Sequence, residues 1–175
     1  MRQTEDWTPE EKKSLIAAAE KGDPWAQCQL GAIYATGSFG EVDAVKSLDW
    51  YRRAAEQDFG EAQYNLGLIH IFGEGVEKNL NTGLQWLEKA AANHESDAEQ
   101  LLGEIYEQGA FGVPRNLDLA VKWYTAAADH GNAKAKYCLG LLFTAGKGVP
   151  KDEARGRQLI QEAADAGYRY ADVPK

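Results

Sequence analysis

The three histidines, His70, His94 and His130, are the side chains that first suggest chemistry. His94 and His130 fall at the carboxyl-terminal ends of the second helices of two adjacent sequence repeats, where they could approach each other and collect a metal ion together with Glu95 and Asp97. No spacing such as H-x-x-x-H supports that arrangement, so the sequence predicts neither a metal site nor a cofactor. His70 takes a position that is otherwise aromatic, and we interpret it as a buried or groove-edge imidazole with a hydrogen-bond partner.

The cysteines and the glycine-rich segments offer no catalytic site. Cys28 and Cys138 lie at different positions in the first and last of four sequence repeats, beyond the Cα separation of a disulfide, so we expect two reduced thiols. The segment from Gly146 to Gly148 resembles part of a phosphate loop but lacks both the G-x-x-x-x-G-K-[ST] spacing and a preceding strand. No Ser-His-Asp or Cys-His set is favoured. The sequence therefore predicts a protein that is not an enzyme.

A fourfold repeat organises the chain and must position any functional side chain. The dipeptide Leu-Gly recurs with its glycine at 31, 67, 103 and 140, which gives spacings of 36, 36 and 37 residues. A period in this range is typical of helical repeat proteins. In every copy an aromatic residue or His follows three positions after that glycine, a second glycine follows six positions after it, and an Ala pair lies near the end of the copy. The sequence thus predicts four structural units of one kind.

Each copy predicts two antiparallel helices. In the second copy, Ala62, Leu66, Ile69 and His70 share one helical stripe, and Asn79 is a good N-cap for the helix that follows. Glycine in a helix interior costs about 1 kcal/mol relative to Ala, so the glycine of each Leu-Gly pair needs a packing reason. We expect close approach of a neighbouring helix, with the Ala pair of the second helix as the matching small surface and a Trp between the units.

The predicted architecture is a single all-α domain over residues 1–175, an α-solenoid of helix-turn-helix repeats wound as a right-handed superhelix. Residues 8–21 are expected to form an N-terminal capping helix, because Thr8 and Glu11 make a capping box and Pro9 takes the first helical position. The repeats are placed at 24–57, 60–93, 96–130 and 132–167. The tail, 168–175, is expected to be short and packed by its tyrosines.

The repeated pattern A-x-x-x-L-G-x-x-Y-x-x-G-x-G-V, followed by a capped helix with Trp and an Ala pair, resembles the Sel-one-like repeat, a relative of the tetratricopeptide repeat. The resemblance covers about residues 8 to 167. It implies an α-solenoid that serves as a protein-interaction scaffold, with the first helices lining a concave face. Asp58, His70, His94 and Leu159 depart from the pattern, which affects local packing and turns. The cysteine pairs of a secreted, cysteine-rich branch of that family are absent.

Composition and charge exclude several kinds of partner. The chain carries a formal net charge of −8 at pH 7 and has a pI near 4.9, so nucleic acid and anionic membrane surfaces would be repelled. No run of 18 apolar residues is present and the first six residues are mostly polar, so neither a transmembrane helix nor a secretory signal is expected. We therefore expect a cytoplasmic protein without nucleic-acid or membrane partners.

The predicted groove lies on a second stripe of the first helices. In the related tetratricopeptide geometry, groove-facing positions are those at −3, −2, +1, +4 and +5 from the Leu-Gly glycine. A helix that is apolar on two stripes must bury both, and stacking uses only one, so the other needs a partner or crowds against the rest of the chain. The predicted partner-binding residues are Tyr64, Asn65, Leu68, Ile71, Phe72, Gln100, Glu104, Glu107, Gln108, Tyr137 and Leu141.

The resulting hypothesis is a non-enzymatic interaction module or scaffold that binds a protein or peptide in this groove, as a monomer or weak dimer. Glu104 and Glu107 favour a basic partner, which they would steer electrostatically. One alternative is an immunity or inhibitor protein that sequesters a toxin or an enzyme. Another is a protein that binds or hydrolyses a small molecule in the same groove, as the resemblance implies for some members of the cysteine-rich branch of the family.

Overall fold

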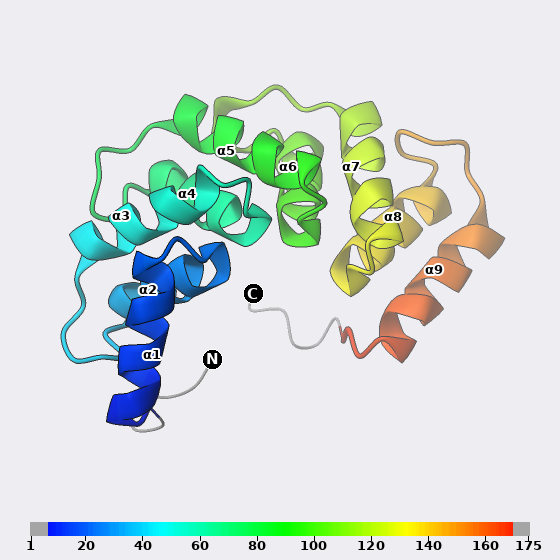
Figure 1. Cartoon of the computed structure of the whole chain (residues 1–175). Coiled ribbons are helices and arrows are strands. Elements are labelled where there is room, and N and C mark those ends of the chain that lie inside the picture. Colours follow the sequence, from blue (N-terminus) through cyan, green and yellow to red (C-terminus); the bar gives the residue numbers. More distant parts are fainter. Residues whose placement is uncertain (1–6, 170–175) are drawn as a thin grey trace. The chain divides into compact units, whose positions relative to one another are not determined.

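All regular structure in the described residues, 7–169, is helical in the computed structural model (Figure 1). This range holds nine α-helices, one short 3-10 helix and no strand, so the predicted all-α class and helix count are confirmed. The elements are α1 (Pro9–Glu20), α2 (Pro24–Thr36), α3 (Ala44–Ala55), α4 (Gly60–Phe72), α5 (Leu80–Ala92), α6 (Ser96–Gln108), η2 (Ala110–Gly112), α7 (Leu117–Asp129), α8 (Ala133–Ala145) and α9 (Glu153–Asp165).

The chain folds into two compact units, Met1–Asn93 and His94–Lys175. The first unit contains α1 to α5, and in it α1 packs on α2, α2 on α3, α3 on α4, and α4 on α5. The second unit contains α6 to α9, which pack on one another in the same sequential way. Each unit therefore contains two helix pairs of the predicted repeat, and the first unit adds the N-terminal helix.

The second helix of every pair begins after an Asp or Asn N-cap, which confirms the cap predicted at Asn79. The side chains of Asp43, Asn79, Asn116 and Asp152 each accept a hydrogen bond from the backbone N–H three residues later. The backbone N–H of each cap residue also donates, over 2.8 to 2.9 Å, to the carbonyl of the residue three after the Leu-Gly glycine. We call this second bond the cap clamp, and it fixes the chain reversal between paired helices. The predicted capping box of Thr8 and Glu11 is likewise confirmed at α1.

The helix ends require left-handed backbone at fixed positions. Gly73 ends α4 with φ 79°, and equivalent glycines end α2, α6 and α8. Asp58 and His94 adopt φ 59° and 60° at a position that Gly22 and Gly131 occupy in other repeats. Asp58 and His94 therefore keep the backbone of the glycine they replace.

The glycine of each Leu-Gly pair lets two helices of one repeat approach closely. A Cβ at Gly31 would lie 2.6 Å from the Tyr51 ring, and one at Gly103 would lie 2.6 Å from the Tyr124 ring. The predicted close approach is confirmed, but the expected partner, the Ala pair, is wrong. The residue that meets the glycine comes directly after the Trp position, because that residue points from the second helix toward the first helix of its own repeat.

The Ala pairs instead serve the contact between repeats. Ala54 and Ala55 of α3 share a buried cluster with Ala62 and Leu66 of α4. Trp86 of α5 packs against the same cluster, which contains residues of both repeats 1 and 2, as expected for a ring placed between repeats. Short side chains thus bring successive repeats together, and the large rings close the remaining space.

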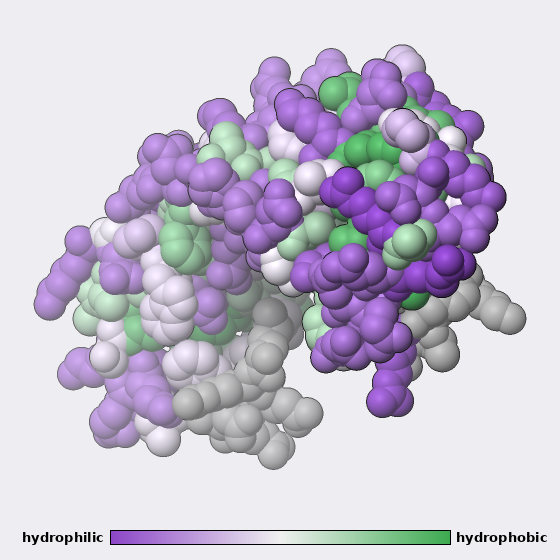
Figure 2. Space-filling model, turned by 90° about the vertical axis from the view of Figure 1, so that its right-hand side faces the viewer, coloured by the Kyte–Doolittle hydropathy of each residue, from purple (hydrophilic) through white to green (hydrophobic). Residues whose placement is uncertain are grey.

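On the face shown in Figure 2, hydrophilic residues dominate and hydrophobic residues lie between them in small patches. None of the helices in residues 7–169 combines the length and the apolar character that crossing a bilayer requires.

Candidate functional site

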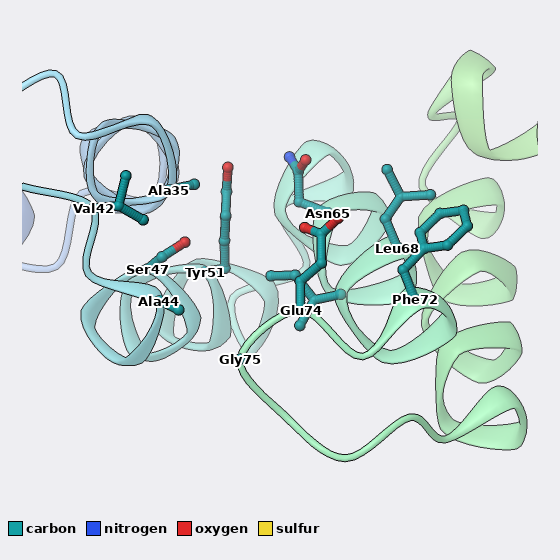
Figure 3. Close-up of a pocket in the computed structure, with 11 residues that line it drawn as sticks. Ala35, Val42, Ala44, Ser47, Tyr51, Asn65, Leu68, Phe72, Glu74 and Gly75 are labelled. Atoms are coloured by element: carbon teal, nitrogen blue, oxygen red, sulfur yellow. The ribbon is translucent and has the colours of Figure 1, made fainter.

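An open pocket of about 310 Å³ lies in the first unit, between the helices of repeat 1 and the first helix of repeat 2 (Figure 3). We call it the Tyr51 pocket. Ala35 of α2, Val42 of the turn that follows and Ala44 at the start of α3 form one side, and α4 forms the other. Ser47 and Tyr51 of α3 line it between these walls. Every lining residue belongs to residues 35–75, so the pocket is complete within one unit.

Tyr51 places one polar atom in these mainly apolar surroundings. Its ring packs against Gly31 and is 5% exposed, while the residue stands upright between Ala35 and Asn65 (Figure 3). The hydroxyl makes no hydrogen bond to any residue in the range 7–169. Burial raises the pKa of this phenol, and the charges of Cys28, Glu61 and Glu74 raise it further. Tyr51 therefore stays protonated and can donate a hydrogen bond to a ligand.

Helix α4 supplies the apolar edge of the pocket. Leu68 and Phe72 lie one helical turn apart and side by side in Figure 3, and Phe72 is 57% exposed. Asn65 lies one turn before Leu68, and its Nδ2 donates to the Glu61 carbonyl over 2.8 Å, which directs its Oδ1 away from that bond. Glu74 adds a carboxylate at the front of the pocket (Figure 3).

A second hollow, of about 330 Å³, lies along α2. Trp7 and Trp25 line it together with Gln29, Ala32 and Thr36 of α2. Trp25 is 54% exposed, an unusual degree for so large an apolar ring. The groove-facing stripe of α2 is thus accessible along its length, from Gln29 to Ala35.

Comparison with known proteins identifies the repeat. The Sel1 repeat model matches residues 26–59, 60–94, 96–132 and 133–168. The chain belongs to the Sel1 repeat family. These matches agree with the four predicted repeats to within a few residues, and the resemblance inferred from the sequence is confirmed. Sel1 repeats in general are protein-interaction modules.

Solved structures share the helical-repeat solenoid fold. A Sel1 repeat protein from Oxalobacter formigenes is 34% identical with a TM-score of 0.86, over 92% of this chain and 46% of its own. The protective antigen c5321 of uropathogenic Escherichia coli is 35% identical with a TM-score of 0.82, over 89% of this chain and 33% of its own. This chain therefore spans less than half the length of either protein.

One curated relative matches over a shorter stretch. Chitin synthase regulatory factor 3 of Schizosaccharomyces pombe is 46% identical over 56 residues, which is 31% of this chain and 6% of that protein. The similarity is thus confined to a small part of a much longer relative.

Among the predicted binding residues of repeat 2, Asn65, Leu68 and Phe72 line the Tyr51 pocket, and Tyr64 is half-buried. The placement of Ile71 in the groove is wrong. Ile71 is fully buried, because position +4 points toward the second helix of the same repeat and Gly83 there leaves room for it. A Cβ at Gly83 would come within 2.6 Å of Ile71 Cγ1.

In repeat 3 the structure corrects the expected acidic surface. The Gln100 side chain is buried, with its Nε2 unpaired, rather than on the groove surface; Gln108 is exposed. Glu104 forms an ion pair with Lys134 over 2.7 Å. Glu107 accepts a hydrogen bond from the Tyr124 hydroxyl over 2.8 Å. These two carboxylates are engaged internally, so they do not form the open acidic patch that was expected.

In repeat 4, Leu141 is 44% exposed and matches Leu68 in position. Tyr137 packs on Tyr168, with ring centroids 5.3 Å apart, so the expected packing of the tail by its tyrosines holds for Tyr168. The rest of that prediction, from residue 170 onward, lies outside the described residues.

His70 shows how repeat 2 departs from its neighbours. Its side chain makes no hydrogen bond within residues 7–169, and Nδ1 is buried, so the expected partner is wrong. Burial lowers the pKa of His70, and the Arg52 charge lowers it further. The imidazole is thus held in its neutral form.

The other histidines and the cysteines are not among the residues that line the Tyr51 pocket. His94 and His130 approach each other, with ring centroids 4.7 Å apart, and the acid beside them is Glu99 rather than Glu95 or Asp97. Cys28 and Cys138 are free thiols. Burial raises the pKa of Cys138 to about 11, with further contributions from the charges of nearby glutamates.

Proposed function

We propose that this Sel1 repeat protein binds an extended segment of a partner protein along its first unit, with one apolar side chain of that segment inserted into the Tyr51 pocket. The observation that carries the proposal is the open, mainly apolar pocket with a hydrogen-bond donor inside it and the exposed Phe72 at its edge. Its volume of about 310 Å³ lies at the low end for small-molecule sites, which suits a single side chain better than a whole ligand.

The polar groups of the pocket suit a peptide backbone. The Tyr51 hydroxyl can donate to a peptide carbonyl, and Asn65 Oδ1 can accept from a peptide N–H. Buried donors and acceptors that gain a partner only on binding favour ligands with matching groups. The apolar contact would come from Leu68, Phe72 and Val42, the last of which is 65% exposed.

A basic residue beside the inserted side chain would add a further contact. Glu74 lies at the front of the pocket, and no ion pair neutralises it within the described residues. The preference for a basic partner is therefore proposed to rest on Glu74, since Glu104 and Glu107 are engaged elsewhere. Such a rim charge would act mainly on the rate and salt dependence of association.

Two lines support partner binding over catalysis. Sel1 repeats are generally interaction scaffolds, and one relative is named as a regulatory factor of an enzyme. The pocket offers no nucleophile with an adjacent base, because its titratable groups are a protonated phenol and a single carboxylate. An immunity-type inhibitor would be a special case in which the bound partner is a toxin or an enzyme.

The decisive experiment fills the pocket without disturbing the fold. Ala35→Leu places an isobutyl group in the space above Tyr51, and Leu68→Ser/Phe72→Ser removes the apolar edge. Partners captured by the wild-type protein are identified and purified, and their affinities are then measured by calorimetry. We expect each variant to weaken binding by about tenfold or more, as for the loss of anchors worth about 1 to 2 kcal/mol each.

Leu141→Ser is the matched control, because Leu141 occupies the position of Leu68 in the second unit. It should bind like wild type. Equal weakening by all three variants, or wild-type affinity in Ala35→Leu, would exclude the Tyr51 pocket as the binding site. Circular dichroism of each variant checks that the helices are intact.

A further inference from the structure

A buried amide at position −4 from the Leu-Gly glycine is fully bonded in both repeats of the first unit. Gln27 Nε2 donates to the Ala19 carbonyl over 3.0 Å, and its Oε1 accepts from Gln57 over 2.8 Å. Gln63 repeats the pattern with the Ala55 carbonyl at 3.1 Å and Asn93 at 2.8 Å. The amide links the end of the preceding second helix to the end of its own second helix. Both its donor and its acceptor are used.

Repeat 3 replaces this amide network with groups that bind metal ions. Glu99 stands where Gln27 and Gln63 stand, and His130 stands where Gln57 and Asn93 stand. His94 takes the left-handed position of Gly22 and Asp58. Within the described residues, these three form a group whose candidate ligand atoms all lie within 4.8 Å of one another. The cluster lies wholly in the second unit.

Glu99 is buried, whereas His94 and His130 are exposed. The Glu99 side chain is 3% exposed, and its Oε2 lies 2.8 Å from Nδ1 of His130. A carboxylate cannot donate a hydrogen bond as the amide does, and carboxylates in buried positions are typically paired with a cationic group or coordinate a metal ion. His94 and His130 are both exposed, so they can rotate toward an ion that approaches from solvent.

We propose that His94, Glu99 and His130 form a binding site for a divalent transition-metal ion of the zinc class. Two imidazole nitrogens and one carboxylate oxygen are a common ligand set for zinc with an open coordination position. Ligands of a tetrahedral zinc ion lie about 3.3 Å apart at ordinary bond lengths, so the atoms must draw together by about 1 to 2 Å at most. The solvent-exposed side leaves the fourth position to water.

The neighbouring acids do not complete this site. Asp97, one of the ligands considered from the sequence, accepts a hydrogen bond from Asn132 over 2.9 Å. The ion would instead join His94 in the turn between α5 and α6, Glu99 in the first turn of α6, and His130 at the end of α7. It would therefore fasten together three segments of the second unit, where Gln63 fastens the equivalent segments of the first unit by hydrogen bonds.

The test uses residues that the chain already accepts at equivalent positions. Glu99→Gln restores the amide of repeats 1 and 2, His94→Gly restores the glycine of repeats 1 and 4, and His130→Asn restores the asparagine of repeat 2. Tag-free, EDTA-treated protein is titrated with ZnCl₂ by calorimetry at pH 7.5, and its melting temperature is measured with and without zinc. His70→Gln serves as a control that removes an imidazole elsewhere.

We expect one zinc ion per wild-type chain and a rise of several degrees in melting temperature at saturating zinc. Each of the three site variants should weaken zinc binding by at least tenfold, while His70→Gln should not. All variants should remain helical in EDTA. Absence of a zinc-dependent rise in melting temperature would overturn the proposal. So would unchanged zinc affinity in Glu99→Gln, which would show that zinc binds elsewhere, as at Cys138.

Discussion

Each unit contains one junction between repeats: repeats 1 and 2 meet in the first unit, and repeats 3 and 4 meet in the second. The two junctions share the same arrangement of helices, but the first contains an open pocket and the second is filled by side chains. In both, a tyrosine of the second helix lies beneath the Leu-Gly glycine at the same distance, Tyr51 below Gly31 and Tyr124 below Gly103. Four residues after the glycine, however, the first junction has Ala35 and the second has Glu107.

This one position decides what the tyrosine hydroxyl does. Glu107 accepts the hydroxyl hydrogen bond of Tyr124 and occupies the space above its ring. Ala35 is too short to do either, so the Tyr51 hydroxyl stays unbonded and the Tyr51 pocket opens. The first helix of the following repeat also differs between the units. Helix α4 carries Asn65 and Phe72, and α8 carries Cys138 and Ala145 at the same positions. Side chains alone thus decide whether a Sel1 repeat junction is packed, as in the second unit, or contains an open pocket, as in the first.

The largest expected difference concerns the two glycines above the tyrosines. Gly103→Val should cost about 3 kcal/mol or more of unfolding free energy, and Gly31→Val only about 1 to 3 kcal/mol. The Tyr124 ring is held by Glu107, whereas the Tyr51 ring can tilt into its pocket. Urea unfolding followed by circular dichroism measures both. Equal losses would mean that the two tyrosines are equally constrained.

Removing the hydroxyls should separate the junctions next. Tyr124→Phe leaves the Glu107 carboxylate without its donor and should cost about 1.5 to 3 kcal/mol. Tyr51→Phe should change the unfolding free energy by less than about 0.5 kcal/mol, because that hydroxyl has no partner to lose. The same urea measurement applies, and Tyr124→Phe/Glu107→Gln should cost less than the sum of its single variants. A full loss in Tyr51→Phe would contradict the unbonded hydroxyl.

Thiol reactivity should report the difference in access. With a pKa of about 11, Cys138 should carry about 100-fold less thiolate at pH 8 than an ordinary cysteine of pKa 9.0. Its alkylation rate should rise about tenfold per pH unit between pH 8 and 10, because only the deprotonated form reacts. A cysteine placed at the equivalent pocket position, Asn65→Cys, should react much faster in a Cys138→Ser background. Mass spectrometry of iodoacetamide adducts gives both rates, and similar rates would argue against an open pocket.

The smallest expected effect concerns the helix that walls each junction. Helix α4 carries His70, and α8 carries Phe143 at the same position. The folded-state pKa of His70 lies below its ordinary value, so the unfolded chain binds more protons as pH falls below about 6.5 and stability decreases. His70→Phe should remove this component, and its melting temperature should exceed that of wild type by more at pH 5.5 than at pH 7.5. A difference independent of pH would contradict the lowered pKa.

The sequence predicted the fold well because the features that define each repeat depend on interactions between residues close in the chain. The spacing of the Leu-Gly glycines, the four N-caps and the left-handed glycines each depend on residues close in the chain. The capping box at Thr8 is of the same kind. Interactions of this type can be predicted from a single sequence, and the four repeats can be compared with one another to find the positions that recur.

The site was predicted only in part because it depends on which helix each side chain faces. Leu68 and Phe72 were correctly assigned to an accessible stripe, but Ile71 was not, since Gly83 on the paired helix makes room for it. The engagement of Glu104 and Glu107 depends on Lys134 and Tyr124, which lie far along the sequence. One available signal was overlooked. Position −4 carries Gln, Gln, Glu and Lys in the four repeats, and a carboxylate among amides marks Glu99.

The cap clamp has a consequence for how this chain can be lengthened. The cap lies six positions after the helix-ending glycine in three repeats, but Asn116 lies seven positions after Gly109. The additional residue is absorbed in η2, where Phe111 adopts φ 55°, and the clamp from Asn116 to the Tyr106 carbonyl keeps its length of 2.8 Å. The turn can therefore change length while the two helices that flank it stay in register. Peptide epitopes or affinity tags could be grafted between Phe111 and Gly112, and the same tolerance offers evolution a place to add new recognition loops.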